Sequence, residues 1–147
     1  MPERETMRRA QEDAREGKSP STQAGEFVRE EMHHIREGRH GAANTKQAIA
    51  IGLSKARRAG VKLKPGGSSQ SRKKAKQDLK ASRQHRKPSR KRSQAREKAL
   101  QREPRSAASH NSLSRQARSA ARKRSSSSRS QAARKAARTR ARERKAA

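Results

Sequence analysis

Arginine and lysine are the residues of this sequence whose number and spacing could do chemistry, and that chemistry is the binding of phosphates. There are 42 of them against 13 Asp and Glu, which gives a formal net charge of +29. Residues 67–147 carry 28 of the bases and four of the acids. Bases held against DNA release its condensed counterions, and a guanidinium suits bidentate phosphate contacts. The pattern therefore favours nucleic acid as the partner.

The candidate phosphate-binding residues are bases that cluster after residue 54. The first five follow or end a predicted helix, where cations also suit the helix dipole, and the others stand in runs further along the chain. The set is Lys55, Arg57, Arg58, Lys62, Lys64, Arg72, Lys73, Lys74, Arg90, Lys91, Arg92, Arg122, Lys123, Arg124, Arg134, Lys135, Arg138, Arg140 and Arg142. Phe27 is the single aromatic residue, and single-strand binders generally stack bases on aromatic rings. We expect largely sequence-independent contacts with duplex DNA, with structured RNA as the second candidate.

No other residues form a pattern typical of catalysis. Cysteine is absent, and no glycine-rich phosphate loop or nucleophile–base pairing is present, so we expect no enzyme. Three histidines lie near glutamates and could bind a metal, but polar pairing within one helix is the interpretation we favour, so no metal or cofactor is predicted; these residues are His33, His34, His40, Glu30, Glu31 and Glu37. No apolar run approaches the roughly 18 residues of a membrane span. The basic tail also lacks the apolar face or aromatic anchors that membrane binding usually needs, so no membrane partner is expected.

Local signals predict two helices joined by a short turn in about residues 20–60. Ser19 and Pro20 are typical of a helix start. Asn44 can cap a second helix, with Gln47 reaching back toward it, and Gly60 is suited to end that helix. Apolar residues at helical spacing mark one side of each helix, and Gly52 with nearby alanines would allow close packing. A homodimer through this hairpin, or a bound ligand, would complete its small core.

The distribution of charged and apolar residues divides the chain into three parts. Residues 1–18 are predicted to form a marginal charged helix, residues 19–65 the helical hairpin module, and residues 66–147 a disordered tail rich in Arg, Lys, Ser and Ala. Fourteen Val, Ile, Leu, Met and Phe residues are too few to offset the ordering entropy of the whole chain. The expected fold class is therefore mainly α with extensive disorder. Residues 131–145 could become helical when phosphates neutralise them.

The hairpin resembles a family of small basic bacterial proteins that carry an uncharacterised N-terminal helical domain and a variable basic tail. The residues that carry the resemblance are STQAGEFVREEMHHIREG (21–38) and TKQAIAIGLSKARRAGV (45–61). Members are often labelled DNA-binding or plasmid-stabilisation proteins. The resemblance covers roughly residues 3–65 and implies a bacterial cytoplasmic setting. It supplies no established mechanism and no functional residues.

These observations favour a non-enzymatic DNA-binding protein of the nucleoid-associated or plasmid-stabilisation type, located on the cytoplasmic nucleoid. One alternative is a protein-interaction module that the basic tail tethers to nucleic acid. Another is an RNA-binding or ribosome-associated factor. A less favoured version of DNA binding is a helix-turn-helix that reads bases from the start of the second helix; its residues would be Asn44, Thr45, Lys46 and Gln47.

Overall fold

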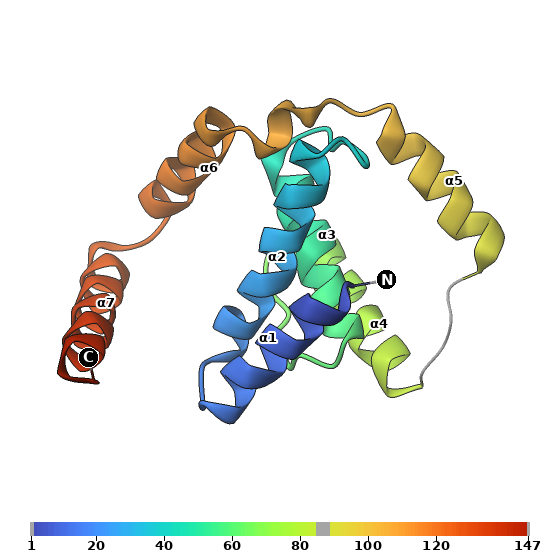
Figure 1. The fold of residues 1–147 in the computed structure, drawn as a ribbon. Helices are drawn as coiled ribbons and strands as arrows, with labels where there is room; N and C mark the ends of the chain where they lie inside the picture. The colour runs from blue at the N-terminus through green and yellow to red at the C-terminus, as the bar shows by residue number, and fades with distance from the viewer. Residues whose placement is uncertain (1, 85–88, 147) are drawn as a thin grey trace. The chain divides into compact units, whose positions relative to one another are not determined.

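The computed structural model describes residues 2–84 and 89–146. These residues form seven α-helices and one 3₁₀ helix and contain no strand (Figure 1). The helices are α1 (Arg4–Arg15), α2 (Pro20–Arg36), α3 (Thr45–Arg58), α4 (Ser69–Arg83), α5 (Arg90–Gln101), η1 (Arg105–Ala108), α6 (His110–Arg122) and α7 (Ser126–Ala146). The chain divides into two compact units, Met1–Ser112 and Leu113–Ala147. Within the described residues, no helix is long and apolar enough to cross a membrane.

Helices α2 and α3 form the predicted hairpin, and both begin where the sequence indicated. Ser19 Oγ accepts a hydrogen bond from the Thr22 amide at 3.4 Å, and Asn44 Oδ1 accepts one from the Gln47 amide at 3.0 Å. The Gln47 side chain reaches back one residue further than expected, because its Oε1 accepts from the Ala43 amide at 2.7 Å. Gly60 has a positive φ of 98°, which ends α3 as predicted.

The core lies where α1, α2 and α3 meet. Phe27 and Ile35 are fully buried, and Phe27 belongs to a cluster with small residues of all three helices. Gly52 of α3 lies so close to α2 that an added Cβ would stand 2.8 Å from Val28 Cα. The predicted close approach of the two helices is therefore confirmed, and it depends on the absence of a side chain at Gly52.

A segment distant in sequence holds the loop between α2 and α3. Residues 100–108, which we call the clasp, accept hydrogen bonds from this loop and its flanking helices through four backbone carbonyls. The bonds run from Gly41 N to Leu100 O (2.8 Å), Ala42 N to Pro104 O (3.1 Å), Thr45 Oγ1 to Ala107 O (2.7 Å) and Arg36 Nε to Ala108 O (3.0 Å). Ala107 and Ala108 are buried there. Residues 100–108 thus contribute to the fold, although the sequence predicts them to be part of a disordered tail.

The prediction of a long disordered tail over residues 66–147 is wrong, because α4, α5, α6 and α7 occupy most of it. Three of these helices are directly preceded by a serine whose Oγ accepts a hydrogen bond from the amide three residues later at 3.2 Å; these serines are Ser68, Ser109 and Ser125. Ala, Arg, Lys and Gln all favour helix. A like-charge pair at helical spacing opposes helix by only about 0.2–0.5 kcal/mol. This repulsion is too weak to oppose helix strongly, and residues 131–145 are helical within α7.

Candidate nucleic-acid interface

Helix α4 presents five basic side chains on one face. Four of them follow one another at intervals of four, four and three residues, so all five fall within an arc of about 100° on a helix of 3.6 residues per turn. All five are exposed. We call this set the α4 stripe; it consists of Arg72, Lys73, Lys76, Lys80 and Arg83.

The other side of α4 is fixed to α3 through a buried carboxylate. Asp78 is 1% exposed and accepts hydrogen bonds from Ser54 Oγ at 2.6 Å and Arg58 Nε at 3.1 Å. Lys74 Nζ lies 3.2 Å from the same carboxylate. Burial alone would raise the pKa of Asp78, but the bonds from Ser54 and Arg58 and the charge of Lys74 together hold that pKa below its ordinary value. The ionised Asp78 therefore orients the α4 stripe away from α3.

Helices α6 and α7 each carry a basic face of their own. On α6, Arg115, Arg118 and Arg122 lie within an arc of about 60°, and all three are exposed. On α7, an arc of about 100° holds five exposed bases, namely Arg134, Lys135, Arg138, Arg142 and Lys145. Each helix can therefore lay several cations along one polyanion.

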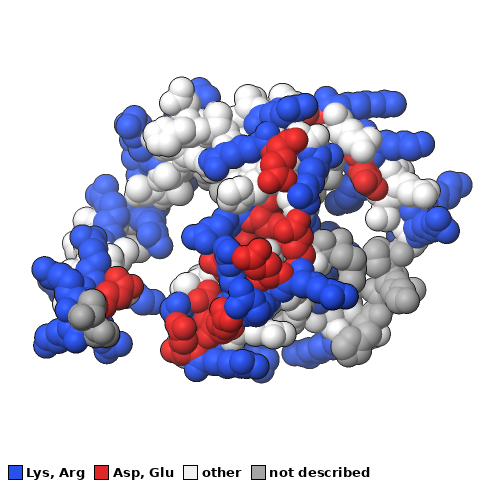
Figure 2. Space-filling view, in the orientation of Figure 1, with Lys and Arg blue, Asp and Glu red and all other residues white. Residues whose placement is uncertain are grey.

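The bases of these three faces have no acidic partners within residues 2–84 and 89–146. Every ion pair found there joins residues between Glu3 and Asp78, and the last base to take part is Lys74. Figure 2 shows the acidic side chains gathered mainly over α1 and α2, while Lys and Arg dominate α7. Cations without a protein partner are those able to exchange small counterions for phosphates.

The helical hairpin and the chain that leads from it toward α4 form a segment that begins at the N-cap residue Ser19 and ends at Gly66. This segment matches DUF6496, a family of unknown function. No curated protein and no solved structure gives a significant match. The DUF6496 segment, residues 19–66, accounts for 48 of the 147 residues. The α4, α6 and α7 faces all lie outside it.

The five predicted bases of the DUF6496 segment differ in their surroundings. Lys55 Nζ lies 2.7 Å from Glu31 Oε2 and 3.3 Å from Glu30 Oε1. Arg58 binds Asp78, and Arg57 is half-buried. Lys62 and Lys64 are exposed. The structure thus leaves Lys62 and Lys64 available for phosphates and gives Lys55 and Arg58 partners within the fold.

The predicted bases beyond the DUF6496 segment are exposed, although Lys74 is paired with Asp78. The members that are exposed and form no ion pair within residues 2–84 and 89–146 are Arg72, Lys73, Arg90, Lys91, Arg92, Arg122, Lys123, Arg124, Arg134, Lys135, Arg138, Arg140 and Arg142. Choosing bases by their runs in sequence missed others that helical spacing could have found, because they complete the three faces. These are Lys76, Lys80, Arg83, Arg115, Arg118 and Lys145.

The start of α3 has little left with which to read bases. Asn44 and Gln47 cap the helix, and Thr45 is buried with its hydroxyl bonded to the clasp. Within the described part of the chain, Lys46 is the one candidate side chain of the four that is exposed and makes no hydrogen bond. The geometry disfavours the helix-turn-helix interpretation, in which these side chains would enter the major groove.

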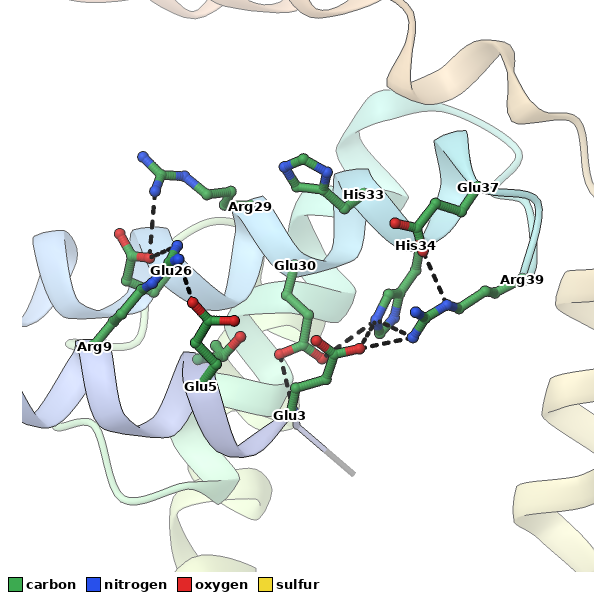
Figure 3. Close-up of a pocket in the computed structure, with 11 residues that line it drawn as sticks. Glu3, Glu5, Arg9, Glu26, Arg29, Glu30, His33, His34, Glu37 and Arg39 are labelled. Atoms are coloured by element: carbon green, nitrogen blue, oxygen red, sulfur yellow. Dashed lines mark hydrogen bonds and ion pairs between the residues drawn. The ribbon is translucent and has the colours of Figure 1, made fainter.

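A shallow pocket of about 210 Å³ between α1 and α2 is rich in acidic side chains, in contrast to the basic faces of α4, α6 and α7 (Figure 3). Its lining includes five glutamates and three arginines; the glutamates are Glu3, Glu5, Glu26, Glu30 and Glu37. Glu3 Oε1 lies 3.0 Å from His34 Nε2 and 2.7 Å from Arg39 Nη1. These bonds, that of His34 first, lower the pKa of Glu3. The excess of carboxylates makes this face unsuited to phosphates.

Proposed function

We propose that this protein binds nucleic acid, with duplex DNA favoured, by placing the basic faces of α4, α6 and α7 against phosphates. The observation that carries the proposal is the α4 stripe: five exposed bases with no acidic partner among the described residues, on a helix whose other side is fixed to α3 by Asp78. A disordered arm would have to lose conformational entropy on binding. An anchored helix has already lost much of this conformational entropy before it binds.

The dimensions of the stripe suit a polyanion. Arg72 and Arg83 are separated by about 16 Å along α4, at 1.5 Å per residue, and an α-helix fits the major groove of B-DNA, which is about 12 Å wide. Phosphate contacts fix position but carry no sequence information. Phe27, the single aromatic side chain, is fully buried, so it is not available to stack on bases. Binding would therefore be largely independent of sequence.

In this role the protein would act without catalysis, on the nucleoid, as a nucleoid-associated or plasmid-maintenance protein. The acidic face of α1 and α2 would point away from DNA, because its carboxylates repel phosphates. The family match at residues 19–66 neither adds to nor limits this role, since that family has no known function.

The experiment compares two variants that lose the same charge from different helices. R72Q/K76Q/K80Q/R83Q removes four cations from the α4 stripe, and R4Q/R8Q/R9Q/R15Q removes four from α1. Affinity for a fluorescent 30-base-pair duplex is measured by anisotropy at fixed salt, with duplex RNA in parallel. We expect the α4 variant to bind at least about tenfold more weakly, and the α1 variant to stay within about threefold of wild type. Equal losses would contradict the proposal, and tighter binding of RNA would reassign the ligand.

A further inference from the structure

Two adjacent glutamates of α2 are buried beside a single lysine. The side chains of Glu30 and Glu31 are 2% and 0% exposed, and Lys55 Nζ contacts both. Glu30 also accepts a hydrogen bond from the Glu3 amide at 3.2 Å. Within the described part of the chain, neither oxygen of Glu31 has a hydrogen bond of good geometry. One ammonium balances one carboxylate, so a second buried negative charge needs a cation.

Two imidazoles stand beside Glu31. His40 Nε2 lies 3.3 Å from Glu31 Oε1, and one donor atom from each of Glu31, His34 and His40 lies within 4.8 Å of the others. His40 Nδ1 is 3.0 Å from the carbonyl oxygen of Gly41. Because a carbonyl can only accept, Nδ1 carries the proton there, and in a neutral ring Nε2 then has a lone pair. A lone pair facing a carboxylate requires a cation between them or a proton on the ring.

We propose that Glu31, His34 and His40 bind a divalent transition-metal ion of the zinc class. Imidazole nitrogen and carboxylate oxygen are its usual ligands, at about 2.0–2.1 Å, which puts two ligand atoms of a tetrahedral ion about 3.3–3.4 Å apart. The distance of 3.3 Å between His40 and Glu31 already meets this requirement. A donor atom of His34 lies within 4.8 Å of the other two ligand atoms, so a rotation of the half-buried His34 side chain would complete the site.

The surroundings of the three ligands match those of a metal site. A ligating histidine commonly gives its other ring nitrogen to a carbonyl or carboxylate. His40 Nδ1 has the Gly41 carbonyl, and His34 Nε2 has Glu3 at 3.0 Å, which leaves Nδ1 of His34 for the metal. Arg39 Nη1 also lies 3.0 Å from His34 Nε2 and would keep its ion pair with Glu3. When the metal takes Glu31, Lys55 keeps Glu30 as its partner at 3.3 Å. The metal then supplies the positive charge that Glu31 lacks once Lys55 pairs with Glu30 alone.

The metal would secure the loop that the clasp holds. His40 lies in this loop, and the next residue, Gly41, donates its amide to Leu100 O. An ion that joins His40 to α2 therefore fixes the loop from the side of the helix, while the clasp fixes it from residues 100–108. The site would have a structural role that does not depend on the binding of nucleic acid.

The test is a titration of tag-free, nucleic-acid-free full-length protein with Co²⁺, followed by visible absorption and by displacement with Zn²⁺. The variants are H34A, H40A and E31Q. The matched control is H33A, because His33 is exposed and points away from His34 in Figure 3. We expect one equivalent of tightly bound metal in wild type and in H33A. Loss of His34 or His40 should weaken binding by more than the roughly 10–100-fold that an outer-shell partner is worth.

Three results would overturn the proposal: no stoichiometric binding by wild type, unchanged affinity in both H34A and H40A, or equal loss in H33A. If wild type binds no stoichiometric metal, the charge that balances Glu31 would have to be a proton on His40. If E31Q fails to fold, the two histidine variants decide the matter, since their side chains are only partly buried. None of these results bears on the proposed binding of DNA.

Discussion

Asp78 of α4 accepts a hydrogen bond from the hydroxyl of Ser54 on α3 at 2.6 Å. This bond crosses 24 residues of sequence and, with the bond from Arg58, joins the α4 stripe to the helical hairpin. Buried charge thus orients α4, and the proposed contact with a polyanion falls to the exposed charge on its outer face.

Replacing Asp78 by Asn should lower the free energy of unfolding by roughly 1.5–3 kcal/mol, the usual range for hydrogen bonds to a charged group. Urea unfolding followed by circular dichroism measures this change. Glu12→Gln is the control, because it breaks an exposed pair with Arg8 and should change stability by no more than about 0.5 kcal/mol. Equal effects of the two substitutions would show that Asp78 does not anchor α4.

The contribution of Asp78 should depend on pH in one direction. Its pKa is lower in the folded protein than the ordinary value, which is about 3.9, so the unfolded state binds more protons in the acid range and stability rises with pH there. The advantage of wild type over D78N should be complete above about pH 5 and shrink as the pH falls toward 3. Urea titrations across this range test it; a difference that stays constant would contradict the assignment.

Gly52 and Gly25 should respond to alanine in opposite ways. In Gly52→Ala the new Cβ would meet the backbone of Val28 at 2.8 Å, so α2 and α3 must separate, at a cost of about 1–3 kcal/mol. Gly25 lies in α2 with nothing within 4 Å of an added Cβ, so Gly25→Ala should stabilise by about 0.5–1 kcal/mol. Thermal unfolding of both variants measures the two changes in stability. Two changes of the same sign would contradict the close packing of α3 against α2 at Gly52.

The clasp can be released by one methyl group. In Gly41→Ala the new Cβ would lie 1.8 Å from the carbonyl oxygen of Glu103, which forces residues 100–108 away from the loop. Hydrogen exchange should then become faster in peptides that contain Gly41 and Ala42, whose amides bind clasp carbonyls. Gly66→Ala, with open space around it, serves as the control and should leave exchange unchanged. Protection that survives in the Gly41 variant would exclude the clasp as the cause.

The parts of the fold that could be predicted from sequence are those that depend on neighbours along the chain. Ser19 and Asn44 cap helices through atoms three residues away, and Gly60 ends one by its own backbone conformation. The bond from Thr45 to Ala107 spans 62 residues, and no local pattern indicates it. The burial of Glu31 likewise depends on where α3 places Lys55.

The disorder prediction failed for a different reason. It treated a shortage of large apolar residues as a shortage of structure, although α5 is helical without a buried residue. Capping serines and residues of high helix propensity are present throughout residues 66–147, and these local signals favour the helices observed there. The candidate site could not be recognised in a disordered tail. Lys76 and Lys80 differ from other lysines only by their position on the helix α4.

The salt dependence of DNA binding tests the central claim most directly, because it counts the phosphates that the basic faces neutralise. If wild type contacts about ten phosphates, the logarithm of its affinity for a 30-base-pair duplex should fall against the logarithm of salt concentration with a slope near −9. The R72Q/K76Q/K80Q/R83Q variant should show a slope shallower by about 3–4. A wild-type slope of about −3 or less in magnitude, or an unchanged slope in the variant, would contradict the account.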